Sequence, residues 1–173
     1  EHPDAHVHIF NSCSASAGEV LLALKVRDLA AAGHPFHEVV SQATTFCGGM
    51  NTLFVLETLE NLRKNGRLTG LQSVVTAALR IKLLMGSTPQ GEICKRGQAM
   101  SMKQALGKMV EIMEKDPNHV GKLLVLSHCN CLERAFQLKE MVRKNCRFSE
   151  VFICETGGIS TVYANDGGIV AAY

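Results

Sequence analysis

Hydrophobic and polar positions change their spacing along the chain, and these changes predict where the elements lie. Apolar residues recur at helical spacing in four stretches, which we assign as helices at residues 17–32, 36–46, 102–115 and 132–144. Shorter runs rich in Val, Ile, Leu and Phe predict strands at residues 5–10, 51–56, 122–128, 151–155 and 169–173. Two short helices are predicted at residues 58–65 and 71–79. A hairpin is predicted from strands 81–87 and 93–96, which flank a Thr-Pro-Gln-Gly-Glu turn.

Polar residues and glycines mark the ends of these elements. Asn11, Ser12 and Ser14 are candidate caps for the first helix, and Asn130 is a candidate cap for the helix that begins at residue 132. The segments 156–160 and 165–168 are rich in glycine and predict turns.

Strands alternate with helices throughout, which predicts an α/β fold with α+β character. We expect a layered mixed sheet with flanking helices and parallel strand–helix–strand units at both ends of the chain. The methionine-rich helix near residues 100–113 is expected to lie in the core, because its apolar residues share one face.

Composition narrows the class of protein. The 173 residues are 46% hydrophobic and 20% charged with a net charge of +2, so no basic stripe favours nucleic acid as a partner. No apolar run reaches the roughly 18 residues of a membrane span, so we expect no integral membrane association. The first residues do not resemble a signal peptide, and the seven cysteines are odd in number and scattered. We therefore expect a cytoplasmic protein with reduced thiols.

Familiar catalytic and metal-binding patterns are missing from the sequence. His128, Cys129 and Cys131 lie close together, but no second Cys/His pair follows at ligand spacing, so we expect no metal. Neither a Gly-x-Ser-x-Gly elbow nor a P-loop occurs, so we expect no catalytic residue and no cofactor.

One arginine stands out by its position. Arg67 follows Gly66 at the end of a predicted helix and precedes the aliphatic stretch 71–85. One interpretation is a basic helix end, with Arg67 paired to Glu57 or Glu60. The other is that Arg67 binds the anion of an otherwise apolar ligand, because guanidinium stays charged and forms a bidentate fork.

Several motifs, in order, resemble those of the DegV family. The stretch "FVLETLENLRKNGRLTG" is similar to the family's Thr-Leu…Gly-Gly-Arg-Ile segment, and "IKLLMGSTPQGEI" is similar to its Ile-Lys-Pro…Gly-Glu-Ile hairpin. The start "HIFNSCSASAGEVLLALKVRDLAAAG" resembles its Asp-Ser strand and following helix, and "LLVLSHCNCLERAFQLKEMV" resembles its strand, histidine and helix.

The resemblance implies a non-catalytic protein that binds a long-chain fatty acid and presents its carboxylate to a separate fatty acid kinase catalytic subunit. It also implies a division into residues 1–50, a remnant of the family's N-terminal domain, and residues 51–173, the lipid-binding domain. The family has a further region ahead of residue 1. By this resemblance the ligand-binding residues are Gly66, Arg67, Ser160, Thr161 and Tyr163.

The sequence also departs from the family pattern at several places. Asn11 replaces an Asp, Asn65 replaces a Gly, and Met100 stands where an Arg is frequent. Tyr163 stands where the family has a histidine, and a phenol can donate a hydrogen bond but does not titrate near neutral pH. Two other functions stay open on the residues alone: a Cys- or Tyr-dependent enzyme acting on a small acyl substrate, and a structural assembly domain without ligand.

Overall fold

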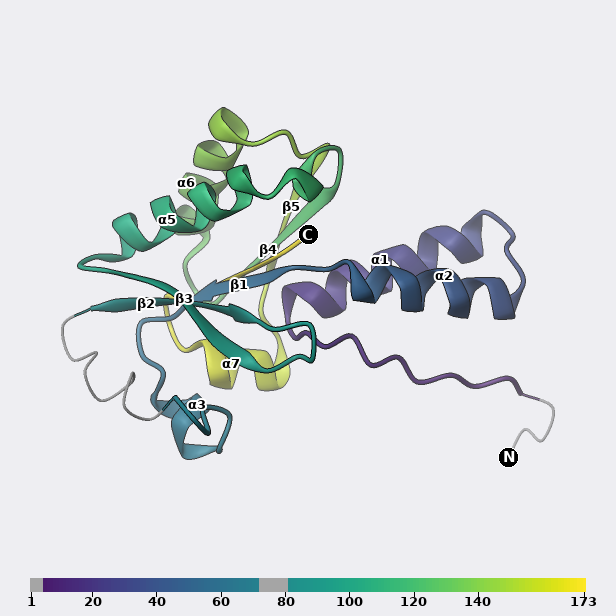
Figure 1. The fold of residues 1–173 in the computed structure, drawn as a ribbon, viewed down its shortest axis with the longest axis horizontal. Coiled ribbons are helices and arrows are strands. Elements are labelled where there is room, and N and C mark those ends of the chain that lie inside the picture. Colours follow the sequence, from purple (N-terminus) through teal and green to yellow (C-terminus); the bar gives the residue numbers. More distant parts are fainter. Residues whose placement is uncertain (1–4, 72–80) are drawn as a thin grey trace.

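The computed structural model describes residues 5–71 and 81–173, which form one six-stranded sheet with helices on both faces (Figure 1). The strands are β1 (Thr52–Val55), β2 (Lys82–Ser87), β3 (Ile93–Ala99), β4 (Leu123–His128), β5 (Glu150–Glu155) and β6 (Ile169–Ala172). The helices are α1 (Ala17–Ala31), α2 (Phe36–Gly48), α3 (Glu60–Lys64), α5 (Met102–Lys115), α6 (Leu132–Asn145) and α7 (Gly158–Ala164), with a 3₁₀ turn at Pro117–His119.

The strand order is β3-β2-β1-β6-β4-β5. Neighbouring strands are antiparallel except β4 and β5, which run parallel and are connected through α6. This mixed sheet confirms the predicted fold class, and β4–α6–β5 is the parallel unit expected near the C-terminal end.

Successive residues of each strand point to opposite faces of the sheet. In β1, Leu53 and Val55 join the core under α5 and α6, whereas Phe54 joins the core on the other face. Both faces are covered by helices, so every residue of β1 is buried. This explains why β1 has a continuous apolar run in the sequence, from Leu53 to Val55, rather than a clear alternation.

The core under α5 and α6 contains the methionines of α5. Met109 and Met113 are fully buried there, which confirms that the methionine-rich helix belongs to the core. Ser101 begins α5 with a side-chain cap, since its hydroxyl accepts a hydrogen bond from the amide of Gln104 (3.3 Å).

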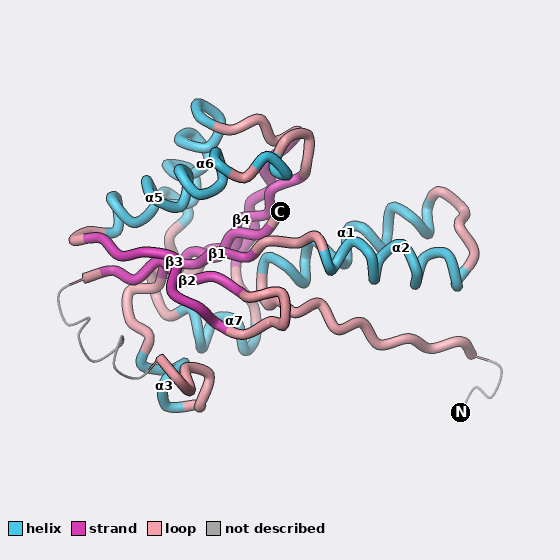
Figure 2. Tube along the Cα trace, in the orientation of Figure 1, coloured by secondary structure: helices cyan, strands magenta, loops and turns pink. Residues whose placement is uncertain are grey.

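The opposite face is covered by the start of α1 together with α3, α7 and the buried Leu68. α1 and α2 form an antiparallel pair that extends away from the sheet (Figure 2). A small separate core holds this pair together: Leu22, Leu29, Val39, Ala43 and Cys47.

The prediction of a strand at residues 5–10 is wrong. This segment is irregular, and Val7 and Ile9 are 81% and 88% exposed. An apolar alternation makes a strand only where a neighbouring strand pairs with it, and none of the described residues does so here. The parallel unit expected near the N-terminal end is therefore also wrong.

The predicted caps of α1 and α6 are wrong as well. Asn11 accepts instead from the amide of Cys13 (3.2 Å) within the preceding loop, and Ser16 occupies the cap position of α1 without a side-chain hydrogen bond. Asn130 adopts φ +50°, and the amide of Cys131 donates to His128 Nδ1 (3.4 Å).

Two further expectations concern particular segments. Residues 158–164 were expected to begin in a glycine-bearing turn and instead form α7. The predicted helix at 71–79 lies, apart from Leu71, outside the described residues. The division at residue 50 into two domains stays a prediction.

Candidate functional site

A cavity of about 650 Å³ opens on the sheet face covered by α1, α3 and α7. Its lining comes from segments far apart in the sequence: the loop before α1, strands β1, β2 and β6, the end of α3, the β2–β3 turn, and α7. The lining includes Ser14, Ser16, Thr52, Phe54, Leu56, Leu62, Gly66, Arg67, Gly86, Glu92, Ser160, Tyr163 and Val170.

The sheet supplies a largely apolar floor. Phe54, Leu56 and Val170 line the cavity together with Gly86 of β2. A Cβ at Gly86 would lie 2.9 Å from the backbone oxygen of Thr52 and 3.0 Å from the Arg96 side chain. Only glycine fits at this close approach of two strands without displacement.

The loop before α1 adds hydroxyl groups to one edge. Ser14 Oγ lies 2.6 Å from Thr52 Oγ1, so this loop is hydrogen-bonded to β1. Ser16 lies next to it with φ +55°, and its Oγ is buried without a hydrogen-bond partner among the described residues. A side chain at Gly18 would collide with Ser14 Oγ, since a Cβ there would lie 1.9 Å away.

The end of α3 brings Arg67 to the cavity through a left-handed glycine. Gly66 has φ +68°, its amide donates to Arg63 O (3.1 Å), and the amide of Arg67 donates to Leu62 O (2.9 Å). These two bonds form a Schellman motif, which ends the helix and turns the chain at once. The interpretation as a helix end and the placement of Arg67 at a cavity are therefore compatible.

The carboxylates that could have paired with Arg67 are bonded to other cations. Glu60 pairs with Arg63 (2.6 Å), and Glu57 pairs with Arg134 (2.9 Å) and with Lys82. Although burial opposes its charged form, hydrogen bonds from Lys82 and Arg134 lower the pKa of Glu57. Within the described part of the chain, the Arg67 guanidinium forms no hydrogen bond or ion pair. The cavity lining itself contains a carboxylate, that of Glu92 on the β2–β3 turn.

α7 forms another wall of the cavity. Ser160 and Tyr163 line the cavity, whereas Thr161 does not and instead lies with its Oγ1 3.0 Å from Thr156 Oγ1. Of the five expected ligand-binding residues, the structure thus brings Gly66, Arg67, Ser160 and Tyr163 around one cavity and places Thr161 outside its lining. Whether any of them binds a ligand stays a prediction.

Sequence reasoning missed the contribution of Ser14 and Thr52. Both are small hydroxyl residues that belong to no recognisable sequence motif. Their contact depends on how the loop at 13–16 packs against β1. No local pattern carries that information.

Comparisons with known proteins identify the relatives of this chain. A family model described as "Uncharacterised protein, DegV family" matches residues 1–173. The chain belongs to the DegV family. A DegV domain-containing protein of Streptococcus gordonii is 30% identical over 173 residues, which are all of this chain and 61% of that protein. The chain thus spans about three fifths of the length of that DegV relative.

Two solved DegV structures share the fold. A DegV family protein from Ruminococcus gnavus, refined with vaccenic acid, is 48% identical with a TM-score of 0.90 and covers 96% of this chain and 59% of its own. The Streptococcus pneumoniae Fatty Acid Kinase (Fak) B3 protein loaded with linoleic acid is 29% identical with a TM-score of 0.86. That alignment covers 99% of this chain and 61% of the pneumococcal chain.

The cysteines of this DegV chain all lie in described segments and are free. Burial raises the pKa of Cys47, Cys131 and Cys146, so their thiols stay protonated and poorly nucleophilic at neutral pH.

Within residues 5–71 and 81–173, no three His, Cys, Asp or Glu side chains gather as a metal site would require. Over the same ranges no helix has the length and apolar character to cross a bilayer.

Proposed function

We propose that this chain binds a long-chain fatty acid in the cavity between α1, α3 and α7, with the carboxylate at the edge formed by Arg67, Ser160 and Tyr163. The observation that carries the proposal is the lining, which combines a largely apolar floor with hydroxyl groups and one guanidinium. An acyl chain gains free energy from apolar burial, and its carboxylate requires hydrogen-bond donors. The volume of about 650 Å³ is in the range of cavities that hold ligands of this size.

Arg67 is the residue that selects a carboxylate over an uncharged headgroup. It is exposed at the cavity edge, and guanidinium presents two parallel N–H groups to a carboxylate. Tyr163 and Ser160 on α7 would add neutral donors. The carboxylate of Glu92 on the β2–β3 turn would repel the fatty acid carboxylate, which favours a headgroup position near Arg67 rather than near this turn.

Related proteins support the ligand class. The Ruminococcus gnavus protein was refined with vaccenic acid, and the pneumococcal protein was loaded with linoleic acid. Because this chain spans only about three fifths of their lengths, the proposal concerns the part of the site that these residues supply.

The proposed partner is a separate catalytic subunit of a fatty acid kinase. The pneumococcal relative is described as a fatty acid kinase protein, and here Arg67 would hold the carboxylate at the cavity edge, where a second protein can reach it. In this scheme the chain binds and presents the fatty acid, and the partner performs the phosphoryl transfer.

Lipid extraction of the purified protein tests the proposal. Mass spectrometry of an organic extract should detect about one fatty acid per protein, and the delipidated protein should bind oleic acid in a calorimetric titration. If neither copurifying nor added fatty acid binds, the proposal is rejected.

A further inference from the structure

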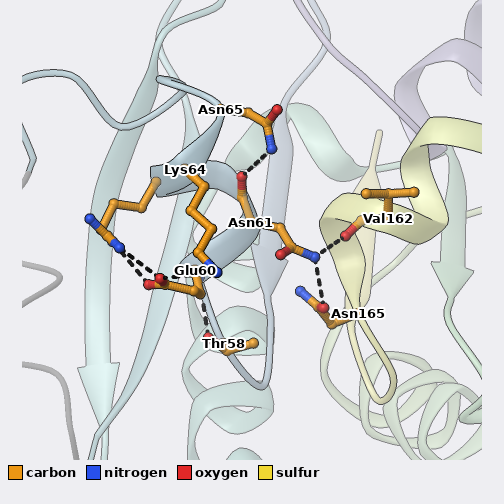
Figure 3. A network of polar contacts seen from close by, with 8 residues as sticks. Thr58, Glu60, Asn61, Lys64, Asn65, Val162 and Asn165 are labelled. Atoms are coloured by element: carbon orange, nitrogen blue, oxygen red, sulfur yellow. Dashed lines mark hydrogen bonds and ion pairs between the residues drawn. The ribbon is translucent and has the colours of Figure 1, made fainter.

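The side chain of Asn61 joins the two walls of the cavity. It extends from α3 toward α7, where its Nδ2 donates to Val162 O (2.6 Å) and to Asn165 Oδ1 (2.9 Å) (Figure 3). Asn61 and its two partners are separated by about a hundred residues of sequence. Among the described residues, this is the side-chain hydrogen bond that connects α3 directly with α7.

α7 depends on such a connection because it is short. α7 has seven residues, and helices of this length are not stable by themselves in water. Its sequence also contains Gly158 and β-branched residues, which favour the helix little. Tertiary contacts must therefore hold α7 in place.

Asn61 binds α7 at the last turn of the helix. Val162 lies in the last turn, whose carbonyl groups lack partners within the helix, and Asn61 supplies a donor to one of them. Asn165, the residue after the helix, has φ +53° and also donates from Nδ2 to Tyr163 O (3.3 Å). The two asparagine side chains thus brace the turn that carries Tyr163.

The other end of this link is fixed to the turn that carries Arg67. The backbone oxygen of Asn61 accepts from the amide of Asn65 (3.2 Å) and from its side-chain Nδ2 (2.8 Å). Gly66 and Arg67 follow immediately. Asn61 therefore lies between the two segments whose side chains line the cavity, the turn at Gly66–Arg67 and α7.

We infer that Asn61 is a positioning residue that holds Tyr163 and Ser160 on α7 at the separation from Arg67 that lets a single carboxylate contact both walls. This inference rests on the proposed function for its ligand, but the link between α3 and α7 is a property of the protein without ligand. It can therefore be measured in two independent ways.

Hydrogen exchange of the ligand-free protein tests the link itself. Asn61→Asp keeps the size of the side chain but removes both donors, and Asn61→Ala removes the whole amide. Both variants should accelerate amide exchange across residues 158–165 by about five- to thirtyfold, the range for one or two lost hydrogen bonds. Asn65→Ala is the matched control, since it removes a bond within α3 and leaves the contact with α7 intact. Unchanged exchange in 158–165 for both Asn61 variants overturns the inference.

Binding of oleic acid and oleyl alcohol tests the consequence. Asn61→Ala should weaken oleic acid about five- to thirtyfold and oleyl alcohol much less, because only the acid uses both walls for its charge. Equal weakening of both ligands would indicate general destabilisation and would overturn the positioning role. If the wild-type protein binds no oleic acid, the proposed function fails, and the exchange measurement alone decides whether Asn61 positions α7.

Discussion

Arg67 is the residue on which recognition of a carboxylate depends most. Replacing Arg67 with alanine removes a charge-assisted hydrogen bond and should weaken oleic acid binding by about 1.5–3 kcal/mol in a calorimetric titration. Stability without ligand should change little, since the described residues provide no ion-pair partner for this guanidinium.

Arg63→Ala is the control for this prediction. Arg63 belongs to the same basic helix end but pairs with Glu60 on the surface, and such pairs contribute about 0–1 kcal/mol. It should leave oleic acid affinity unchanged. Equal affinities in wild type and Arg67→Ala would show that Arg67 serves only to end the helix.

Tyr163 is the second residue that tests the headgroup site. Tyr163→Phe keeps the ring that faces the cavity and removes one hydroxyl, which should lower oleic acid affinity by about 1 kcal/mol with little change in melting temperature. If Tyr163→Phe lowers the melting temperature and leaves oleic acid affinity unchanged, Tyr163 has only a structural role.

Tyr163→His adds a titratable donor at the same place. A bound carboxylate favours the imidazolium, so affinity should be high below about pH 6 and fall as the pH rises through the imidazole pKa, near 6.5 to 7.5. Wild type should show no such step in this range. Calorimetric titrations at several pH values between about 5.5 and 7.5 check the prediction.

Among the elements, α5 has a cap that can be tested alone. The hydroxyl of Ser101 accepts from the amide of Gln104, and Gln104 Oε1 accepts in return from the amide of Met100 (3.1 Å). Ser101→Ala should lower the free energy of unfolding by about 1 kcal/mol, measured by urea denaturation. Ser101→Asp restores an acceptor and should recover most of that loss, whereas an unchanged midpoint for Ser101→Ala would show that the cap contributes nothing.

The accuracy of the sequence predictions differed between elements for physical reasons. α5, α6 and β4 carry their own apolar pattern and sit near the predicted bounds. α7 was missed because its formation depends on contacts such as the one from Asn61 to Val162, which no local pattern shows. The segment 5–10 has the pattern of a strand without a strand to pair with, so the pattern misled.

The candidate site divides in the same way. Arg67, Gly66, Ser160 and Tyr163 were expected from family motifs and do line the cavity. Ser14, Thr52 and Asn61 could not be expected, because each acts through a partner from a distant segment. Such pairings become visible only once the sheet is assembled.

At the scale of the whole molecule, Glu57, which follows β1 in the sequence, connects elements that are distant in the sequence. Its carboxylate binds Lys82 at the start of β2 and Arg134 on α6, and Arg134 also donates to Gly167 O in the loop before β6. These contacts hold the carboxyl pKa below its usual value of 4.5 despite burial.

Acid unfolding measures this connection. A lowered folded-state pKa gives stability that is present above about pH 4.5 and lost as the pH falls through the lower folded value. Glu57→Gln should therefore be less stable than wild type at pH 7, and the difference should shrink below about pH 4.5. Since the side chain is 36% exposed, we expect the difference to be below about 1 kcal/mol after solvent screening.

Glu111→Gln, on the exposed side of α5, serves as the control for the loss of one negative charge. Urea denaturation at several pH values compares the three proteins. A constant difference between wild type and Glu57→Gln across the acid range would contradict the assignment of the lowered pKa.

The central place of β6 joins the two parts of the sheet. β3, β2 and β1 are consecutive strands on one side, and β4 and β5 form a local parallel pair on the other. β6 alone pairs with both groups, and its contact of Ile169 with Val55 closes a loop that spans most of the chain. Closing such loops costs entropy before any packing is gained, which slows folding. The floor of the cavity needs Val170, so the complete lining requires β6 to join the two groups of strands.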